Sequence, residues 1–239
     1  MQAYQIQQFG GPDGLKRVDL PSPSPRHGEV VIRIRAVSLN YRDLLVSKGL
    51  YNPKMKLPRI PVSDGAGEVL SVGPGASRFK PGDRVTANFM SGWIDGGLTD
   101  AKARTALGGD AEGVLAEEVA IPEEALARVP ERLSFEEAST LPCAAVTAWN
   151  ALIEHGRIKP GDTILTQGTG GVSLFAIQIA RMAGARIIVT SSSDEKLARA
   201  LALGADEGIN YKTNPNWEER VRELTGKVGV DHVVELGGA

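Results

Sequence analysis

The stretch Thr163-Ile-Leu-Thr-Gln-Gly-Thr-Gly-Gly-Val-Ser173 decides the fold of this chain. It begins as a short apolar strand and then passes through three closely spaced glycines. An apolar segment of helical length follows, from Val172 to Met182, and Gly184 suits its C-terminal cap. A second strand pattern comes at once, from Arg186 to Thr190. The order strand, glycine turn, helix and strand predicts a βαβ unit.

The glycine turn is typical of a site for a dinucleotide. Gly168 suits a tight turn between strand and helix, because it tolerates dihedrals that other residues avoid. Gly170 has no Cβ atom, so a diphosphate can approach the backbone there, and the following helix N-terminus attracts the anion. The usual third glycine is replaced by Ser173, which is also small. The alternative is a glycine-rich turn without a ligand. The residues that we expect at the diphosphate are Gly168, Thr169, Gly170, Gly171 and Val172.

The composition is that of an ordinary globular protein. The 239 residues are 42% hydrophobic and carry a formal net charge of −2, which suggests neither nucleic acid nor an anionic membrane as a partner. No apolar run is long enough to cross a bilayer, and the first residues lack a secretory core, so we expect a cytoplasmic protein. The single cysteine, Cys143, excludes an internal disulfide and an all-cysteine zinc site.

The first half of the chain reads as short strands separated by glycine and proline turns. Such a pattern predicts a small β-barrel, which we place at residues 1–125. Between residues 92 and 113 lies a glycine-rich insertion, which is either a lid or an oligomer contact. The expected strands are Tyr4–Phe9, Leu15–Leu20, Glu29–Val37, one within Val62–Gly73, one that begins at Pro81–Val85, Leu115–Ile121 and Leu126–Val129.

The second half alternates strands with helices, which predicts a parallel sheet at residues 126–239. Ser134 is a good helix N-cap, and the helical pattern runs on to Glu154 with a break expected at Pro142. Further along, Asp194 is expected to cap a helix. We count four strands where a doubly wound dinucleotide domain has about six, so we expect the sequence to be a fragment. The later elements are expected at Glu207–Tyr211, Trp217–Leu224 and His232–Leu236.

A barrel followed by a nucleotide domain resembles the medium-chain dehydrogenase/reductase superfamily. The resemblance covers the whole chain and is closest to its zinc-independent branch, the quinone oxidoreductases. It implies an α/β fold, with a GroES-like barrel before a partial Rossmann domain, and a homodimer when the chain is full length. The motifs that carry it are Gly28–Arg33, Leu39–Asp43, Pro61–Gly73, Pro81–Val85, Leu141–Trp149 and the glycine turn.

The resemblance also implies where zinc ligands would stand, and the sequence departs from that pattern. The first ligand of the zinc alcohol dehydrogenases is a cysteine in the stretch that reads Leu39–Asp43 here, which has none. Their His-Glu pair is replaced by Ser63 and Asp64. Only Cys143 falls at a ligand position, whereas a catalytic zinc takes three protein ligands. We therefore expect no zinc, and Cys143 to act as a small buried hydrophobic residue.

The residues at the end of the second strand of the βαβ unit predict whether the chain prefers NAD(H) or NADP(H). Enzymes that use NAD carry an acid there to hold the ribose hydroxyls, whereas this chain has Ser191 and Ser192. In the quinone oxidoreductases a lysine and a tyrosine at the positions of Lys196 and Tyr211 bind the 2′-phosphate of NADPH. A cation and a hydroxyl donor suit that dianion. We therefore expect NADP(H), with NAD(H) as the alternative. Thr147 resembles a residue that touches the nicotinamide.

Four side chains are candidates for catalysis without a metal. Asn40 and Asp43 match the N-x-x-D stretch of the family, which borders the nicotinamide pocket, and Tyr41 lies between them. Tyr51 resembles the proton donor of related enoyl reductases, and its hydroxyl is suited to a developing enolate. The alternatives are that Asp43 only caps a helix and that Tyr51 only packs the pocket wall. Leu45 stands where quinone reductases often have a tyrosine.

The expected function is reduction of a quinone, an enone or another activated carbonyl by NADPH. The substrate is expected to be a small molecule, since nothing indicates nucleic acid or a membrane. Two alternatives stay open: oxidation of an alcohol, and binding of NADPH without turnover.

Overall fold

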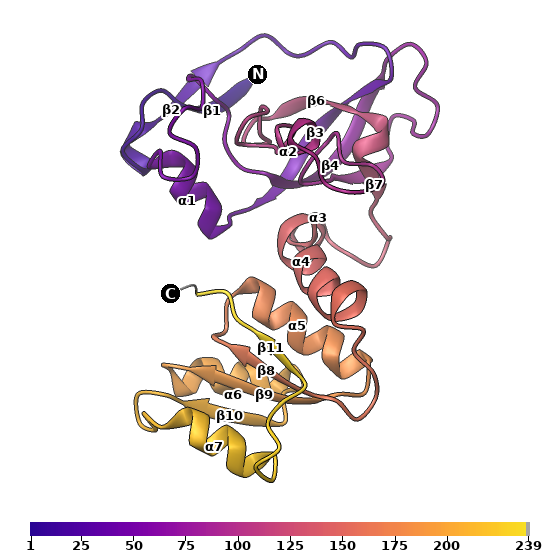
Figure 1. Ribbon diagram of the computed structural model, residues 1–239. Helices are drawn as coiled ribbons and strands as arrows, with labels where there is room; N and C mark the ends of the chain where they lie inside the picture. Colours follow the sequence, from indigo (N-terminus) through magenta and orange to yellow (C-terminus); the bar gives the residue numbers. More distant parts are fainter. Residues whose placement is uncertain (238–239) are drawn as a thin grey trace. The chain divides into compact units, whose positions relative to one another are not determined.

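The structure is a computed structural model that describes residues 1–237, and it divides into two compact units, Met1–Cys143 and Ala144–Ala239 (Figure 1). The division falls later than residue 125, where we expected it. The reason is that strand β7 (Leu126–Arg128) pairs with β5 (Arg84–Ala87), and helix α3 (Phe135–Ser139) packs against β3 and β4. No helix among the described residues is long and apolar enough to span a membrane.

The first unit is built on a five-stranded antiparallel sheet of strand order β6-β3-β4-β5-β7. Its central strand β4 begins at Asp64, directly after a buried Ser63, so the sheet places this pair at a strand start. A separate hairpin joins β1 to β2. The remaining bounds are β1 Gln2–Ile6, β2 Leu15–Asp19, β3 Glu29–Ser38, β4 Asp64–Val72 and β6 Glu118–Pro122.

Short helices connect these strands. Helix α1 (Tyr41–Ser47) follows the long strand β3, and its buried Val46 packs with Ile6 and Met55 in a small cluster. Helix α2 (Asp100–Ala103) lies inside the glycine-rich insertion. The main core of this unit contains Val30, Ile32, Val69, Val85 and Ile121, which come from four strands of the sheet. Two 3₁₀ turns span Pro12–Gly14 and Glu123–Ala125.

The second unit is a four-stranded parallel sheet of strand order β10-β9-β8-β11, as the alternating pattern predicts. Apolar residues of β8 and β9 pack against α5 and α6, whereas Ile188 and Ile209 pack with Val221 of α7. The bounds are β8 Thr163–Gln167, α5 Gly171–Met182, β9 Arg186–Ser191, α6 Asp194–Ala202, β10 Glu207–Asn210, α7 Trp217–Leu224 and β11 His232–Val234.

The helical stretch before this sheet is interrupted close to Pro142, as expected, because α3 ends at Ser139 with Thr140 as its C-cap residue. After α3, a π-helical turn spans Leu141–Ala145 and contains Pro142. Helix α4 (Val146–Trp149) and a second π-helical turn (Asn150–His155) follow. Pro142 lies in the first turn of its π-helical segment. Proline is tolerated in a first turn, because the N–H group that it lacks would have no partner within the helix there.

Helix α3 begins at a capping box formed by Ser134 and Glu137. The first prediction is the effect of removing the Ser134 side chain from it. The Ser134 hydroxyl accepts the N–H of Glu137 at 3.1 Å, and the Glu137 carboxylate accepts the N–H of Ser134 at 2.8 Å. We expect Ser134→Ala to lower the free energy of unfolding by about 1 kcal/mol, because an N–H of the first turn loses its partner. Urea unfolding measures it. The exposed Ser22→Ala is the control, and equal losses in both variants would contradict the role of the cap.

Candidate functional site

The glycine turn lies at the carboxyl end of β8 and is open on its outer side. Gly168 has a φ of 89°, which favours glycine, and its N–H donates to Thr190 O at 2.9 Å. Gly170 is the N-cap residue of α5 and contributes no side-chain cap. A Cβ atom built on either glycine would have no heavy atom within 4 Å apart from chain neighbours. The free N–H groups of the first helical turn therefore face space that a diphosphate can enter.

The residues predicted for the 2′-phosphate gather at the neighbouring strand ends. Ser191 ends β9 and is buried, and its hydroxyl lies 3.5 Å from that of Thr169 in the glycine turn. The N–H of Tyr211 donates to Ser191 O at 3.0 Å, which holds Tyr211 beside β9. Lys196 is exposed in the first turn of α6. The carboxyl edge of the sheet thus brings the residues from three predicted segments together, as parallel strands do.

The cap of α6 differs from our expectation. Ser193 is the N-cap residue, and its hydroxyl accepts the N–H of Lys196 at 3.4 Å. Asp194 is instead the first helical residue, and its carboxylate accepts from the side-chain amide of Asn210 at 2.7 Å. Serine and aspartate are both good caps, so the sequence alone does not choose between them. The consequence for the site is that Asp194 already has a partner across the sheet edge.

A cavity of about 330 Å³ lies within the second unit beside β11. Thr147 from α4 and Val172 from the first turn of α5 both line it, together with residues from Asp231 to Leu236. Thr147 and Val172, which the sequence analysis assigns to the cofactor, therefore line the same cavity although they are far apart in the sequence. Glu235 and Leu236, which follow β11, are lining residues that the sequence reading missed.

The candidates in the first unit cluster at the N-terminus of α1. Asn40 is the N-cap residue, and its N–H donates to the Asp43 carboxylate at 2.8 Å. Asp43 is buried, and that burial raises the pKa of its carboxyl above the ordinary value, against the lowering effects of the Asn40 N–H and the Arg42 charge. Tyr41 is the most exposed of these side chains, with 76% of its surface exposed. Asp43 thus caps the helix, which was one of the two roles left open for it.

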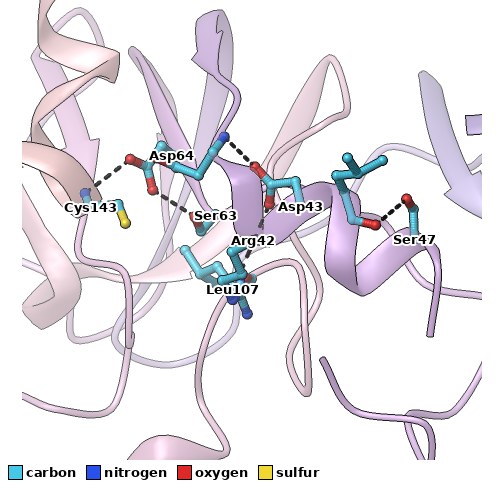
Figure 2. A network of polar contacts seen from close by, with 9 residues as sticks. Arg42, Asp43, Ser47, Ser63, Asp64, Leu107 and Cys143 are labelled. Carbon is cyan, nitrogen blue, oxygen red and sulfur yellow. Dashed lines mark hydrogen bonds and ion pairs between the residues drawn. The ribbon is translucent and has the colours of Figure 1, made fainter. Parts of the chain in front are cut away.

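Asp64 is fully buried and accepts hydrogen bonds on both carboxylate oxygens (Figure 2). The Ser63 hydroxyl donates to Oδ1 at 2.6 Å, and the backbone N–H of Cys143 donates to Oδ2 at 2.9 Å. Burial raises the pKa of Asp64, while the Ser63 hydroxyl, the Asn40 amide, the Cys143 N–H and the Arg42 charge each favour its ionised form. The structure therefore brings together the three segments in which the family resemblance would place zinc ligands.

The backbone is strained just before this carboxylate. Val62 has a φ of 72°, in the left-handed region that a β-branched residue rarely adopts. Its carbonyl accepts the N–H of Val114 at 2.9 Å, and the N–H of Gly113 donates to Ile60 O at 2.8 Å. Strain of this kind costs on the order of 1–3 kcal/mol and persists only where neighbours impose it. Here the end of the glycine-rich insertion imposes it.

Tyr51 is half exposed and rests on a residue that the sequence reading did not single out. The guanidinium of Arg42 lies 4.8 Å from the centre of the Tyr51 ring and 4.6 Å from that of Phe89. Nη1 of Arg42 donates to Leu107 O at 3.0 Å. Arg42 stands inside the N-x-x-D motif, so its position was visible, but its distant partners were not. In the contacts that the described residues make, the three histidines add nothing to this cluster, whereas the Leu45 carbonyl accepts the N–H of Tyr51 at 3.3 Å.

The second prediction concerns the pH dependence that Asp64 gives to stability. Because its pKa in the folded state is raised above 3.8, its contribution to stability is greatest below pH 3.8 and is lost as the pH rises through the folded value. Asparagine does not titrate, and removing the Asp64 charge also relieves the raised pKa of Asp43. Stability of the unaltered protein relative to Asp64→Asn should thus fall from acidic to neutral pH. Urea unfolding across that range measures the difference, and a rising difference would contradict the raised pKa.

Comparison with protein families gives two matches that together cover most of the chain. Residues 26–131 match the alcohol dehydrogenase GroES-like domain, and residues 171–239 match the zinc-binding dehydrogenase family. The first match lies in the unit that holds Asp64, and the second begins at the first residue of α5. The expected fold class, a GroES-like domain before a Rossmann-like parallel sheet, is therefore confirmed.

Two solved structures share this architecture. An NAD-dependent alcohol dehydrogenase is 42% identical, with a TM-score of 0.88 over 98% of this chain and 70% of its own. A mycobacterial protein complexed with NADPH is 33% identical, with a TM-score of 0.82 over 100% of this chain and 68% of its own.

Two curated relatives match over nearly the whole sequence. A zinc-type alcohol dehydrogenase-like protein of Schizosaccharomyces pombe is 48% identical over 97% of this chain and 68% of its own length. A human quinone oxidoreductase is 34% identical over 99% of this chain and 66% of its own length. The chain thus spans about two thirds of the length of these relatives. With both domains, their order and the glycine turn in place, the chain belongs to the medium-chain dehydrogenase/reductase superfamily of NAD(P)-dependent oxidoreductases.

Proposed function

We propose that this protein is a zinc-independent, NADPH-dependent oxidoreductase that reduces a quinone, an enone or another activated carbonyl. The observation that carries the proposal is the carboxyl edge of the parallel sheet. There an open glycine turn adjoins a strand that ends in Ser191, beside Lys196 and Tyr211. The mycobacterial relative complexed with NADPH and the human relative named quinone oxidoreductase support this reading.

The residues present fit NADPH. The open space over Gly168 and Gly170 accepts a diphosphate against the helix N-terminus. No carboxylate stands at the end of β9 to repel a 2′-phosphate, and Asp194 is held by Asn210. Lys196 and Tyr211 supply a cation and a hydroxyl at that edge. Thr147 and Val172 line the cavity beside β11, where the nicotinamide ring would lie. When bound, NADPH supplies the hydride.

The donor set of this chain does not fit a catalytic zinc. Such a site needs three protein ligands, and no group of three histidine, cysteine, aspartate or glutamate side chains that could hold a metal occurs among residues 1–237. Both oxygens of Asp64 already accept hydrogen bonds, which Ser63 and Cys143 donate. We therefore propose that hydrogen bonding, and not a metal, polarises the carbonyl of the substrate.

Tyr51 is the side chain best suited to that task. Its ring is fixed by the guanidinium of Arg42 while 52% of its surface remains exposed, so its hydroxyl can meet a substrate. A tyrosine hydroxyl that donates to the reduced oxygen stabilises the developing enolate and can release its proton to it. Tyr41 is more exposed and lies at the first position of α1, while Asn40 and Asp43 set the start of that helix. We assign these three to the wall of the substrate pocket.

The second candidate function is oxidation of an alcohol with NAD. A solved relative named an NAD-dependent alcohol dehydrogenase favours it, at 42% identity. The two functions differ in the cofactor that the sheet edge selects, so the cofactor preference separates them.

The third prediction is that the protein prefers NADPH to NADH. We expect NADPH to bind at least tenfold more tightly than NADH, because Lys196 and Tyr211 meet the 2′-phosphate. Quenching of tryptophan fluorescence during titration with each cofactor measures both dissociation constants. Lys196→Ala should weaken NADPH binding and leave NADH binding unchanged. Tighter binding of NADH would favour the alcohol dehydrogenase reading, and binding of NADPH without turnover of any enone or quinone would favour a binding protein.

The fourth prediction separates a binding glycine from a structural one. Gly170→Ala adds a methyl group that meets no protein atom within 4 Å, at a backbone φ of −76° that alanine adopts. We therefore expect unchanged urea unfolding but at least tenfold weaker NADPH binding, since the methyl group occupies the path of the diphosphate. Gly97→Ala, also in open space, is the matched control and should change neither. Equal affinity of Gly170→Ala and the unaltered protein would place the diphosphate elsewhere.

A further inference from the structure

The side chain of Arg42 is a buried part of the cluster around Tyr51, and the proposed reaction gives it no role. Its side chain is only 9% exposed, yet its Nε and Nη2 atoms are buried without a hydrogen-bond partner. Leaving a buried cationic donor without a partner is costly, so a protein keeps such a group where it serves a purpose. Its ion pair with Asp43 is long, at 3.9 Å between Nη1 and Oδ1. An ion pair of that length does little to offset the desolvation of a buried guanidinium.

The planar contacts of Arg42 are closer. The guanidinium carbon lies 4.8 Å from the centre of the Tyr51 ring and 4.6 Å from that of Phe89, so both aromatic rings contact one cation. Cation–π contacts of this kind contribute about 0.5–2 kcal/mol, more when they are desolvated. Lysine lacks the planar group that stacks in this way. The orientation of the Tyr51 ring is therefore tied to a residue that itself cannot reach a substrate.

The end of the glycine-rich insertion holds Arg42 in place. Ala106 to Gly109 are buried, and Leu107 O accepts from Nη1 of Arg42 at 3.0 Å (Figure 2). A Cβ atom on Gly109 would overlap Nη2 of Arg42, so any side chain at this position would push the guanidinium aside. The next residue, Asp110, accepts from the side-chain amide of Asn52 at 2.8 Å, directly beside Tyr51. The insertion thus contacts both Arg42 and the segment that carries Tyr51.

We propose that Arg42 is a positioning residue for Tyr51, and that Leu107–Asp110 is the fixed support against which it is held. The proposal rests on the proposed function, in which the Tyr51 hydroxyl donates to the reduced oxygen. It gives this end of the insertion a role inside the substrate site, in place of the lid or oligomer contact expected from sequence. Arg42 acts only through Tyr51, and its effect on the rate must disappear when the Tyr51 hydroxyl is absent.

The fifth prediction is a double-mutant cycle of Arg42→Met and Tyr51→Phe. We expect Tyr51→Phe to lower kcat by about 10²-fold, the usual range for loss of a proton donor. Arg42→Met should lower kcat about tenfold and leave KM for NADPH unchanged. The double variant should be no slower than Tyr51→Phe alone, because Arg42 has nothing left to position. Tyr4→Phe, at a similarly exposed tyrosine, is the control and should keep full kcat. Multiplied losses in the double variant would overturn the proposal.

A second pair of variants tests the support without touching the charge. Gly109→Ala forces Nη2 of Arg42 aside, whereas Gly97→Ala in the same insertion meets no atom within 4 Å. We expect Gly109→Ala to lower kcat as Arg42→Met does and Gly97→Ala to leave it unchanged. Equal activity of the two would overturn the role of the support.

Fluorine NMR distinguishes failure of this proposal from failure of the proposed function. The chain has 4 tyrosines, which 3-fluorotyrosine labels and single phenylalanine variants assign. We expect Arg42→Met and Gly109→Ala to shift the Tyr51 signal and to leave the Tyr4 signal in place, whether or not the protein turns over a substrate. An unmoved Tyr51 signal would overturn the positioning role. Absence of turnover in the unaltered protein, with a shifted signal, would overturn the proposed function and leave Arg42 as the residue that holds Tyr51.

Discussion

The buried carboxylate of Asp64 is the constraint on which the first unit depends. An ionised group without exposure to water is unfavourable unless its oxygens are hydrogen-bonded, and both are, through Ser63 and the backbone of Cys143. The bond from the Cys143 N–H joins the start of β4 to the π-helical turn that follows α3, and the two residues lie 79 positions apart in the sequence. Burial is the main cause of the raised pKa of Asp43, and the charge of Asp64 adds to that rise, so the capping of α1 is coupled to Asp64.

The second unit depends on a different kind of constraint, the free end of one helix. Helix α5 lacks a side-chain cap because Gly170 stands at its N-cap position. Its first N–H groups must therefore find a partner outside the helix, either water or an anion. A side-chain cap would take one of those N–H groups and leave fewer of them to an anion. The absence of a cap, rather than the presence of any one side chain, is what makes this edge suitable for a diphosphate.

Sequence patterns predicted the second unit well because its signals are local. The bounds of α7, Trp217–Leu224, are those expected, and α5 and β9 differ from expectation by one residue at one end. Periodicity and glycine placement act over a few residues, and so do the strand ends that position Ser191 and Tyr211. Errors arose where two residues compete for one local role, as Ser193 and Asp194 do for a cap. The break expected near Pro142 does occur, at the end of α3, but the π-helical turn that follows has no signal in the sequence pattern.

The site in the first unit was harder to predict, because its contacts join distant parts of the chain. The bond from Arg42 to Leu107 spans 65 residues, and no periodicity links the two. Glycines 108 and 109 belong to the insertion that we expected to be a lid or an oligomer contact, and both are buried. Gly108 meets the strained backbone of Val62, and Gly109 meets the guanidinium of Arg42. A glycine-rich segment can therefore be rigid when its glycines mark places where the backbone must come close to something else. Only the position of that neighbour distinguishes the two cases, and the position is a property of the fold.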